Sequence, residues 1–272
     1  MKLGIGTYAY AWAIGTVTGQ RPGVPMDAGK FLRRCAGLGV ELVQIADNLP
    51  LHLLADEELG RVEGEAEELG LAVEVGTRGI GPNLLRDYLE ICRKFESPVL
   101  RTVIDTADFQ PSVGEVVEIL RGMKREFEEA GVTLALENHD RFSVRTFAEI
   151  LERVDSSHLG ICLDTANSFG ALEGPEVVVE ALGPHVVNLH IKDFAVRRID
   201  HSLGFVVEGT AAGQGQLDIP WLLERLGKLA KGDFNAILEL WPPPEEDVEA
   251  TVRKEEAWVA ASVDYLRSLI PE

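Results

Sequence analysis

The chain has 272 residues, of which 46% are hydrophobic, and its 45 acidic and 26 basic residues give a formal net charge of -19. A chain of this length and hydrophobic content can bury one large core. Such an acidic protein repels phosphate backbones and anionic membranes, which argues against nucleic acids and membrane surfaces as partners.

Cysteine usage and hydropathy point to the cytoplasm. Cys35, Cys92 and Cys162 lie far apart and show no C-x-x-C spacing, so neither a disulfide framework nor a cysteine zinc site is expected. Gly and Thr interrupt the apolar N-terminal stretch, which therefore does not resemble a secretory signal. No segment has the uninterrupted apolar length of a membrane span. We expect a soluble, cytoplasmic protein.

From the N-terminus onward the chain repeats one pattern, a short apolar or β-branched run, a polar loop and a longer stretch with helical spacing. The runs that predict strands cover residues 3–8, 40–46, 71–77, 98–104, 132–138, 159–165, 186–193 and 236–241. Helices are predicted between them, for example over residues 26–39, 113–131 and 217–232. Eight strand-then-helix units with short connections predict a single (β/α)8 TIM barrel. No linker or composition break divides residues 1–272, so one domain is expected.

An open, doubly wound sheet is the alternative architecture. Such a sheet would be expected to have a G-x-G-x-x-G phosphate-binding motif after its first strand. The sequence GIGTYAYAWAIG at residues 4–15 does not match that motif. We therefore interpret Gly4 and Gly6 as small residues that fill a crowded barrel interior.

Four polar residues lie near the ends of the last four predicted strands: Glu137, Asp164, His190 and Glu239. In a closed parallel barrel these ends meet at one rim, where active sites are found. Period-two alternation places all four side chains inside, because the residues beside them then face the helices. Those outward residues are Leu134, Leu136, Ile161, Leu163, Leu189, Ile191, Leu238 and Leu240.

Three carboxylates crowded into a barrel mouth repel one another unless a cation lies between them. A divalent ion meets this need. Oxygen-rich ligation with one imidazole suits Mn²⁺, our first choice, and also Mg²⁺ or Co²⁺, with Zn²⁺ as a further alternative. A single acidic residue at a strand end is more often a loop cap, but the coincidence on four consecutive strands favours a ligand set.

Four segments resemble a known family: ALENH (135–139), CLDTAN (162–167), NLHIKDF (188–194) and ILELW (237–241). As a set they resemble the metal-bearing segments of the xylose-isomerase-like TIM barrel superfamily, particularly the sugar phosphate isomerase/epimerase family. The resemblance implies that Glu137, Asp164, His190 and Glu239 bind one divalent metal. It also implies that Glu137 and Glu239 flank the substrate as the acid/base pair that moves a proton between adjacent carbons.

The chain departs from its relatives at two points. Related ketose epimerases often have D-x-x-H where this chain has DTAN, so Asn167 stands in the place of the His and is expected to face the substrate. The basic residue that follows the seventh strand is also offset from the position it has in those epimerases. The endonuclease branch of the superfamily uses three zinc ions and many more histidines, whereas this acidic chain has 6 scattered His.

Further substrate contacts are expected from the rim. Lys192 has the strand parity of His190 and is expected to bind substrate oxygens or stabilise an enolate, or else to pair with a rim carboxylate. Trp241 has the parity of Glu239 and is expected to form an apolar wall or to cap the barrel.

The long segment at residues 192–220 is expected to be a lid or binding loop. We expect Arg198 and His201 within it, and Arg101 on the fourth strand, to meet a carboxylate or phosphate of the substrate. Pairing of the arginines with the acidic surface is the alternative.

The expected activity is that of a divalent-metal-dependent isomerase or epimerase of a small ketose or sugar derivative, acting through a metal-stabilised enediolate. A decarboxylase or dehydratase of an oxo sugar acid or inosose would use the same site. A non-catalytic sugar-binding barrel is a third possibility, against which the pair Glu137 and Glu239 argues. The sequence leaves open which substrate is used and whether it carries a phosphate or a carboxylate. It also leaves open the physiological metal and the oligomeric state, for which a homo-oligomer is one possibility.

Overall fold

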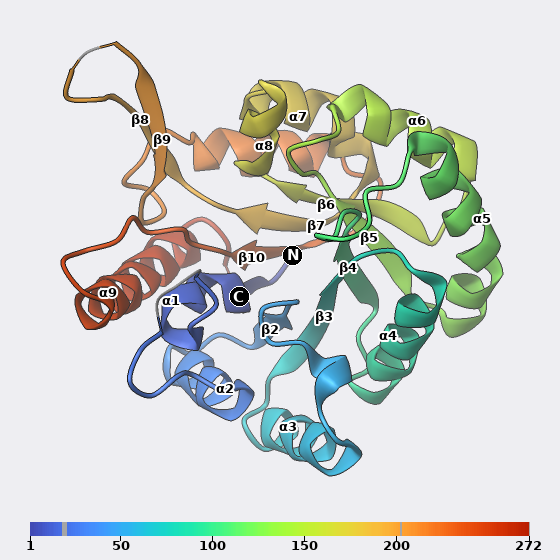
Figure 1. Ribbon diagram of the computed structural model, residues 1–272, viewed down its shortest axis with the longest axis horizontal. Coiled ribbons are helices and arrows are strands. Elements are labelled where there is room, and N and C mark those ends of the chain that lie inside the picture. Colours follow the sequence, from blue (N-terminus) through green and yellow to red (C-terminus); the bar gives the residue numbers. More distant parts are fainter. Residues whose placement is uncertain (18–20, 202, 272) are drawn as a thin grey trace.

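The computed structural model describes residues 1–17, 21–201 and 203–271. Eight parallel strands close into a barrel in the order β1-β10-β7-β6-β5-β4-β3-β2, and helices surround it (Figure 1). The predicted (β/α)8 TIM barrel is confirmed. Its strands are β1 (Leu3–Gly6), β2 (Leu42–Ile45), β3 (Ala72–Arg78), β4 (Val99–Val103), β5 (Thr133–Glu137), β6 (Leu159–Asp164), β7 (Val186–Ile191) and β10 (Asn235–Leu238).

Helix boundaries follow local sequence signals. Ser112 accepts a hydrogen bond from the backbone N–H of Glu115 at the start of α5, and that helix ends at Gly131, whose φ of 67° lies in the left-handed region. The helices are α1 (Ala11–Ile14), α2 (Ala28–Gly37), α3 (Asp56–Glu68), α4 (Pro82–Lys94), α5 (Val113–Ala130), α6 (Val144–Val154), α7 (Pro175–Leu182), α8 (Ile219–Leu229) and α9 (Val248–Arg267). Short 3-10 helices cover Thr7–Tyr10, Leu51–Leu53, Asn167–Ala171 and Gly183–His185. Among the described residues, no helix is long and apolar enough to cross a membrane.

The two glycines of β1 make room inside the barrel, as predicted. A Cβ atom on Gly4 would lie 2.8 Å from Ile237 Cδ1 and 2.9 Å from Leu42 Cγ. A Cβ atom on Gly6 would lie 3.2 Å from the Oε1 atom of Glu239. Larger side chains in β1 would therefore crowd the barrel interior and the mouth at the C-terminal ends of the strands, which we call the upper mouth.

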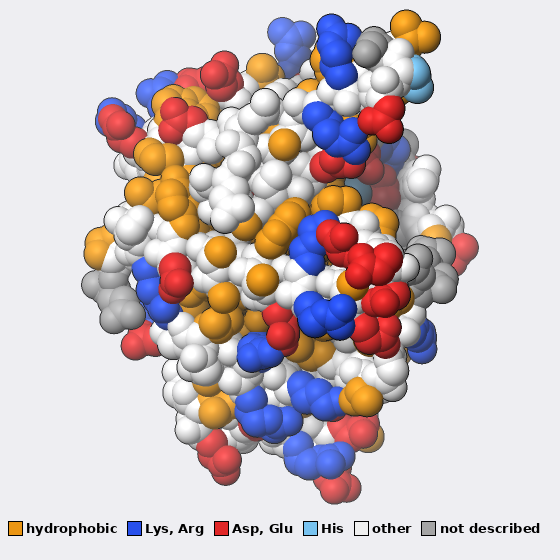
Figure 2. All heavy atoms as spheres, turned by 90° about the vertical axis from the view of Figure 1, so that its left-hand side faces the viewer, with side chains coloured by type: hydrophobic (Ala, Val, Ile, Leu, Met, Phe, Trp, Pro, Cys, Tyr) orange, Lys and Arg blue, Asp and Glu red, His pale blue; other side chains and the backbone are white. Residues whose placement is uncertain are grey.

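The segment that follows β7 contains an antiparallel hairpin that the strand pattern did not predict. β8 (Phe194–Arg198) pairs with β9 (Phe205–Gly209), and the hairpin projects from the barrel at the upper left of Figure 1. Figure 2 shows the face that carries this hairpin, where acidic and basic side chains alternate without forming one extended basic patch.

Asp193 anchors the base of this hairpin and the loop beyond it. Its Oδ1 atom accepts hydrogen bonds from the backbone N–H groups of Phe194 (2.7 Å) and Leu217 (3.1 Å). Its Oδ2 atom accepts from Gly213 and Gly215, both at 2.9 Å. A Cβ atom on Gly215 would lie only 2.1 Å from Asp193 Oδ1, so the loop closes around the carboxylate.

Replacing Asp193 by Ala should lower the free energy of unfolding by about 2–4 kcal/mol, because buried backbone N–H groups lose their acceptor. Urea denaturation measures this change. Asp200→Ala, at an exposed position of the hairpin, is the matched control. Equal stability of the two variants would contradict the anchoring role of Asp193.

Candidate metal centre

The fold brings Glu137, Asp164, His190 and Glu239 together at one mouth of the barrel. Glu137 and Asp164 are the last residues of β5 and β6, His190 is the last but one of β7, and Glu239 directly follows β10. These four strands are neighbours in the barrel, and the register of β6 on β7 places Asp164 beside His190. All four side chains are buried.

The carboxylates converge on one imidazole nitrogen. The Nδ1 atom of His190 lies 3.3 Å from Glu137 Oε2, 3.4 Å from Glu239 Oε1 and 3.8 Å from Asp164 Oδ2. Within the described chain, buried atoms without an aligned hydrogen bond include His190 Nδ1, Asp164 Oδ2 and both carboxylate oxygens of Glu239. Buried polar atoms are normally satisfied, so a cluster aimed at one point fits a bound divalent cation. The donor set of carboxylate oxygens and one imidazole suits Mn²⁺, Mg²⁺ or Co²⁺.

Lys192 supplies positive charge on one side of this cluster. Its ammonium nitrogen lies 2.8 Å from Asp164 Oδ2 and 2.9 Å from Glu239 Oε2. Burial by itself would raise the pKa of Glu239, but His190, when it is protonated, and Lys192 outweigh burial and hold that pKa well below its usual range. The carboxylate of Glu239 is therefore kept ionised and ready for a cation.

Arg101 supplies positive charge on the other side. Its guanidinium is 2% exposed, its Nε donates to Glu137 Oε2, and its Nη1 donates to Asp47 Oδ1 at 2.7 Å. Burial would raise the pKa of Glu137, but Arg101 and His190 lower it on balance. The sequence predicted Arg101 as a substrate contact, and the structure places it between the buried carboxylate of Glu137 and the half-buried carboxylate of Asp47.

Asn167 also contacts Glu137. Its Nδ2 atom donates to Glu137 Oε1 at 2.7 Å, while Arg101 occupies Oε2. Both oxygens of this carboxylate are thus engaged. Glu239 has no aligned hydrogen bond on either oxygen, so the two predicted acid/base residues have unlike surroundings.

A cavity of about 270 Å³ opens beside the cluster. Its lining includes Lys192 and Trp241, two of the predicted substrate contacts. Trp241 is 36% exposed, and its Nε1 donates to the carbonyl of Asp193 at 3.2 Å. The other lining residues are Tyr8, Ala11, Trp12, Val17, Leu240 and Pro242.

Arg198 and His201 lie on or beside the projecting hairpin and are not among the residues that line this cavity. The guanidinium of Arg198 stacks over the ring of Phe205, 4.5 Å from its centroid. Their predicted contact with substrate stays a prediction. The hairpin itself was the missing information, because the sequence showed only a long loop.

Sequence reasoning overlooked several buried residues near the barrel axis, namely Gln44, Glu74, Asn138, Cys162 and Asn188, and the half-buried Asp47. Gln44 and Glu74 interrupt otherwise apolar strands, and this interruption was the available signal. Asn138 was visible in ALENH: its Oδ1 accepts from the backbone N–H of Asp164 at 2.7 Å, which holds that ligand candidate in place. Cys162 Sγ lies near Glu137 and His190 as a further potential donor.

We predict that Asp164→Ala lowers the metal content of the protein well below that of the unaltered chain, because one charged oxygen ligand is lost. Metal analysis after reconstitution with Mn²⁺ and dialysis measures it. Asp140→Ala, at an exposed position nearby, should retain the metal. Stoichiometric metal in Asp164→Ala would remove this residue from the ligand set.

Arg101→Met should destabilise the metal-free protein by about 3–5 kcal/mol, since buried carboxylates then lack their cation. Addition of Mn²⁺ should restore part of the lost stability, because the ion supplies positive charge to the same cluster. Thermal melts in EDTA and in Mn²⁺ measure both effects. Arg197→Met removes an exposed ion pair with Glu208 and should change little. Unaltered stability of Arg101→Met in EDTA would refute the argument.

Comparison with known proteins identifies the family. The family model described as xylose isomerase-like TIM barrel matches residues 112–269. The 3-oxo-isoapionate decarboxylase of Pectobacterium atrosepticum is 34% identical over 271 residues, which cover 100% of this chain and 97% of that protein. The fold is similar to that of D-psicose 3-epimerase in the presence of D-fructose (TM-score 0.73, 14% identity, 100% of both chains). It is also similar to a xylose isomerase-like barrel from Mycobacterium smegmatis in complex with magnesium (TM-score 0.71, 12% identity, 97% of both chains). The chain belongs to the xylose isomerase-like TIM barrel family.

Proposed function

We propose that this protein is a divalent-metal-dependent decarboxylase of a small 3-oxo sugar acid, the alternative to an isomerase in the sequence reasoning. The observation that carries the proposal is the double engagement of Glu137, whose Oε1 accepts from Asn167 and whose Oε2 accepts from Arg101. A two-base isomerase needs both carboxylates free to take and return a proton. A hydrogen bond on each oxygen, one of them from a guanidinium, stabilises the ionised form of Glu137 and makes it a weak base for that task.

Loss of CO₂ from a 3-oxo acid needs no base in its first step. The bond between the carboxylate carbon and its neighbour breaks, and the electron pair stays on the remaining carbon as an enolate. That carbon then takes a proton. The 34% identity to 3-oxo-isoapionate decarboxylase along the whole chain supports the same assignment.

The proposed metal ligands are Glu137, Asp164, His190 and Glu239, with Mn²⁺ as the expected ion. When bound, a divalent ion would polarise the substrate carbonyl and stabilise the negative charge of the enolate. The side chains of Arg101 and Asn167 hold Glu137 in a fixed orientation toward the ion's position.

Lys192 is proposed to bind the substrate carboxylate and to supply the proton. Its side chain is 13% exposed, and its ammonium is the single cationic group among the described side chains that line the cavity. Its contacts with Asp164 and Glu239 place it next to the metal ligands. One ammonium suits one carboxylate, whereas a phosphate is usually held by several donors. The substrate is accordingly proposed to be unphosphorylated.

A metal-dependent isomerase or epimerase is the second candidate, and one observation favours it. Glu239 contacts Lys192 at 2.9 Å and His190 at 3.4 Å, but neither contact is an aligned hydrogen bond, so Glu239 is less constrained than Glu137 and is the better candidate for a base. Epimerisation with Glu239 as the sole carboxylate base would need a different group to return the proton to the opposite face of the enediolate.

The two candidates differ in the products formed in D₂O. The Mn²⁺-loaded protein is incubated with 3-oxo-isoapionate, inososes and a panel of ketoses, and the products are followed by NMR. We expect release of one carbon as bicarbonate from the oxo acid, deuterium at the carbon it left, and unaltered ketoses. Deuterated or epimerised ketoses with the carbon count intact would establish the isomerase instead.

The same assay tests Lys192. Lys192→Met should lower kcat for decarboxylation by about 10²-fold or more, because the proton donor and the carboxylate contact are both lost. The control is Lys231→Met, at an exposed position that does not line the cavity, and it should keep full activity. Full decarboxylase activity of Lys192→Met would overturn the role assigned to Lys192.

A further inference from the structure

A column of polar side chains fills the barrel below the candidate metal centre. It consists of Gln44 on β2, Glu74 on β3, Asn188 on β7 and Asn235 at the start of β10. Gln44, Glu74 and Asn188 are fully or almost fully buried, at 0%, 2% and 0% exposure. Side chains of this kind cost free energy in a barrel interior unless each finds a partner.

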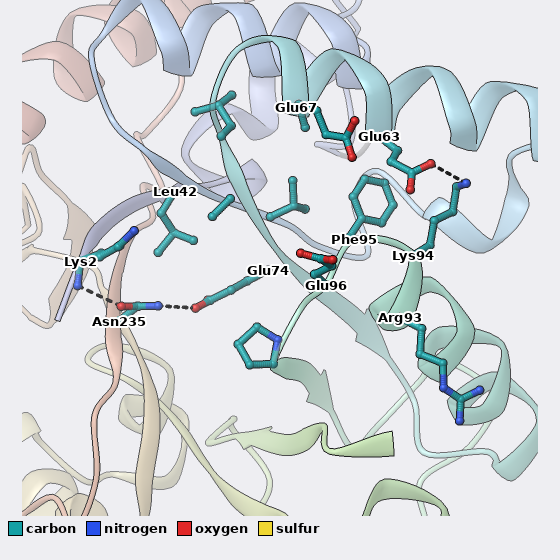
Figure 3. Close-up of a pocket in the computed structure, with 15 residues that line it drawn as sticks. Lys2, Leu42, Glu63, Glu67, Glu74, Arg93, Lys94, Phe95, Glu96 and Asn235 are labelled. Carbon is teal, nitrogen blue, oxygen red and sulfur yellow. Dashed lines mark hydrogen bonds and ion pairs between the residues drawn. The ribbon is translucent and has the colours of Figure 1, made fainter. Parts of the chain in front are cut away.

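The column starts at a donor whose direction cannot change. The backbone N–H of Lys2 donates to Asn235 Oδ1 at 2.9 Å, so the amide nitrogen of Asn235 must face the other way. That nitrogen donates to Glu74 Oε1 at 2.8 Å. Figure 3 shows these two hydrogen bonds beside a cavity of about 430 Å³ at the opposite mouth of the barrel.

Glu74 passes this orientation on to Gln44. Its Oε2 atom accepts from Asn188 Nδ2 at 2.7 Å and from Gln44 Nε2 at 3.2 Å. The same nitrogen of Gln44 also donates to Asn188 Oδ1 at 3.0 Å. Because carboxylate and carbonyl oxygens only accept, Gln44 must turn its NH₂ group down the barrel and its carbonyl upward.

The carbonyl of Gln44 meets the metal-site histidine. Gln44 Oε1 lies 2.7 Å from His190 Nε2. Since a carbonyl oxygen accepts, the hydrogen of the neutral imidazole resides on Nε2, and the lone pair resides on Nδ1, the atom that faces the carboxylates.

We infer that Gln44 and Glu74 are positioning residues that hold His190 in the tautomer and ring orientation needed for metal binding through Nδ1. Partners of this kind on ligand histidines typically change metal affinity by 10–100-fold when they are removed. The inference rests on the proposed metal centre and is independent of whether the reaction is decarboxylation or isomerisation.

Two substitutions break the column at different places. Gln44→Met keeps the side-chain length and removes the acceptor of the His190 hydrogen. Glu74→Gln keeps the shape but adds an NH₂ group, which can donate to Gln44 and allow its amide to turn over. Glu74 does not contact the proposed ligands, so an effect of Glu74→Gln on the metal would travel through Gln44.

The experiment is a Mn²⁺ titration of the full chain, with free Mn²⁺ measured by electron paramagnetic resonance. We expect a 10–100-fold higher Kd in Gln44→Met and in Glu74→Gln. The control is Glu255→Gln, the same carboxylate-to-amide change at a buried residue that accepts from the backbone of Trp12 and Ala13, and its Kd should be unaltered. Circular dichroism of the metal-free variants checks that each is folded. If Gln44→Met does not fold, Glu74→Gln alone decides the matter.

A second readout reports the tautomer directly. In the Zn²⁺-loaded protein, long-range ¹H–¹⁵N correlations of labelled histidine should show the hydrogen of His190 on Nε2, with a His190→Gln sample to assign the signals. A hydrogen on Nδ1 would overturn the inference, as would unaltered Mn²⁺ affinity in the folded variants. Failure of the unaltered chain to bind Mn²⁺ would refute the metal centre itself, and this outcome is distinct from the other two.

Discussion

Repulsion among three buried carboxylates is the constraint on which the upper mouth of this barrel depends. They surround His190 Nδ1 at 3.3 to 3.8 Å, in surroundings almost without solvent. Ionised groups at such distances require positive charge between and around them. Arg101 meets this need from β4 and Lys192 from the end of β7, and the remaining unsatisfied atoms point to the place where a divalent ion fits.

The same constraint shapes the chemistry that we propose. Arg101 and Asn167 each donate to one oxygen of Glu137, which stabilises its ionised form and weakens it as a base. A carboxylate held in this way is a good metal ligand and a poor base. Cleavage of a carbon–carbon bond, with the electrons supplied by the substrate, suits such a site better than abstraction of a proton. Members of one barrel family can differ in reaction through contacts of this kind while they keep the ligand positions.

The interior of the barrel is polar along its axis as well as at its mouth. A chain of hydrogen bonds runs from the backbone of Lys2 to the imidazole of His190. Its links are the side chains of Asn235, Glu74 and Gln44, in that order. Every amide in this column has one permitted orientation, because the column starts at a backbone N–H that can only donate and contains a carboxylate, Glu74, that can only accept. The closed barrel thus supplies both the proposed ligands and the direction in which one of them points.

The sequence by itself determined the barrel and the strand-end positions of Glu137, Asp164, His190 and Glu239, because period-two and helical periodicity are local properties of the chain. Their convergence followed from closure, which brings all strand ends to one rim. Only the tertiary structure decided what each side chain meets. Arg101 bonds to Glu137 rather than standing free at the rim, and Arg198 lies on a projecting hairpin. Gln44 reaches His190 across 146 positions of sequence. Such contacts depend on register and on side-chain reach between distant strands, which no local pattern encodes.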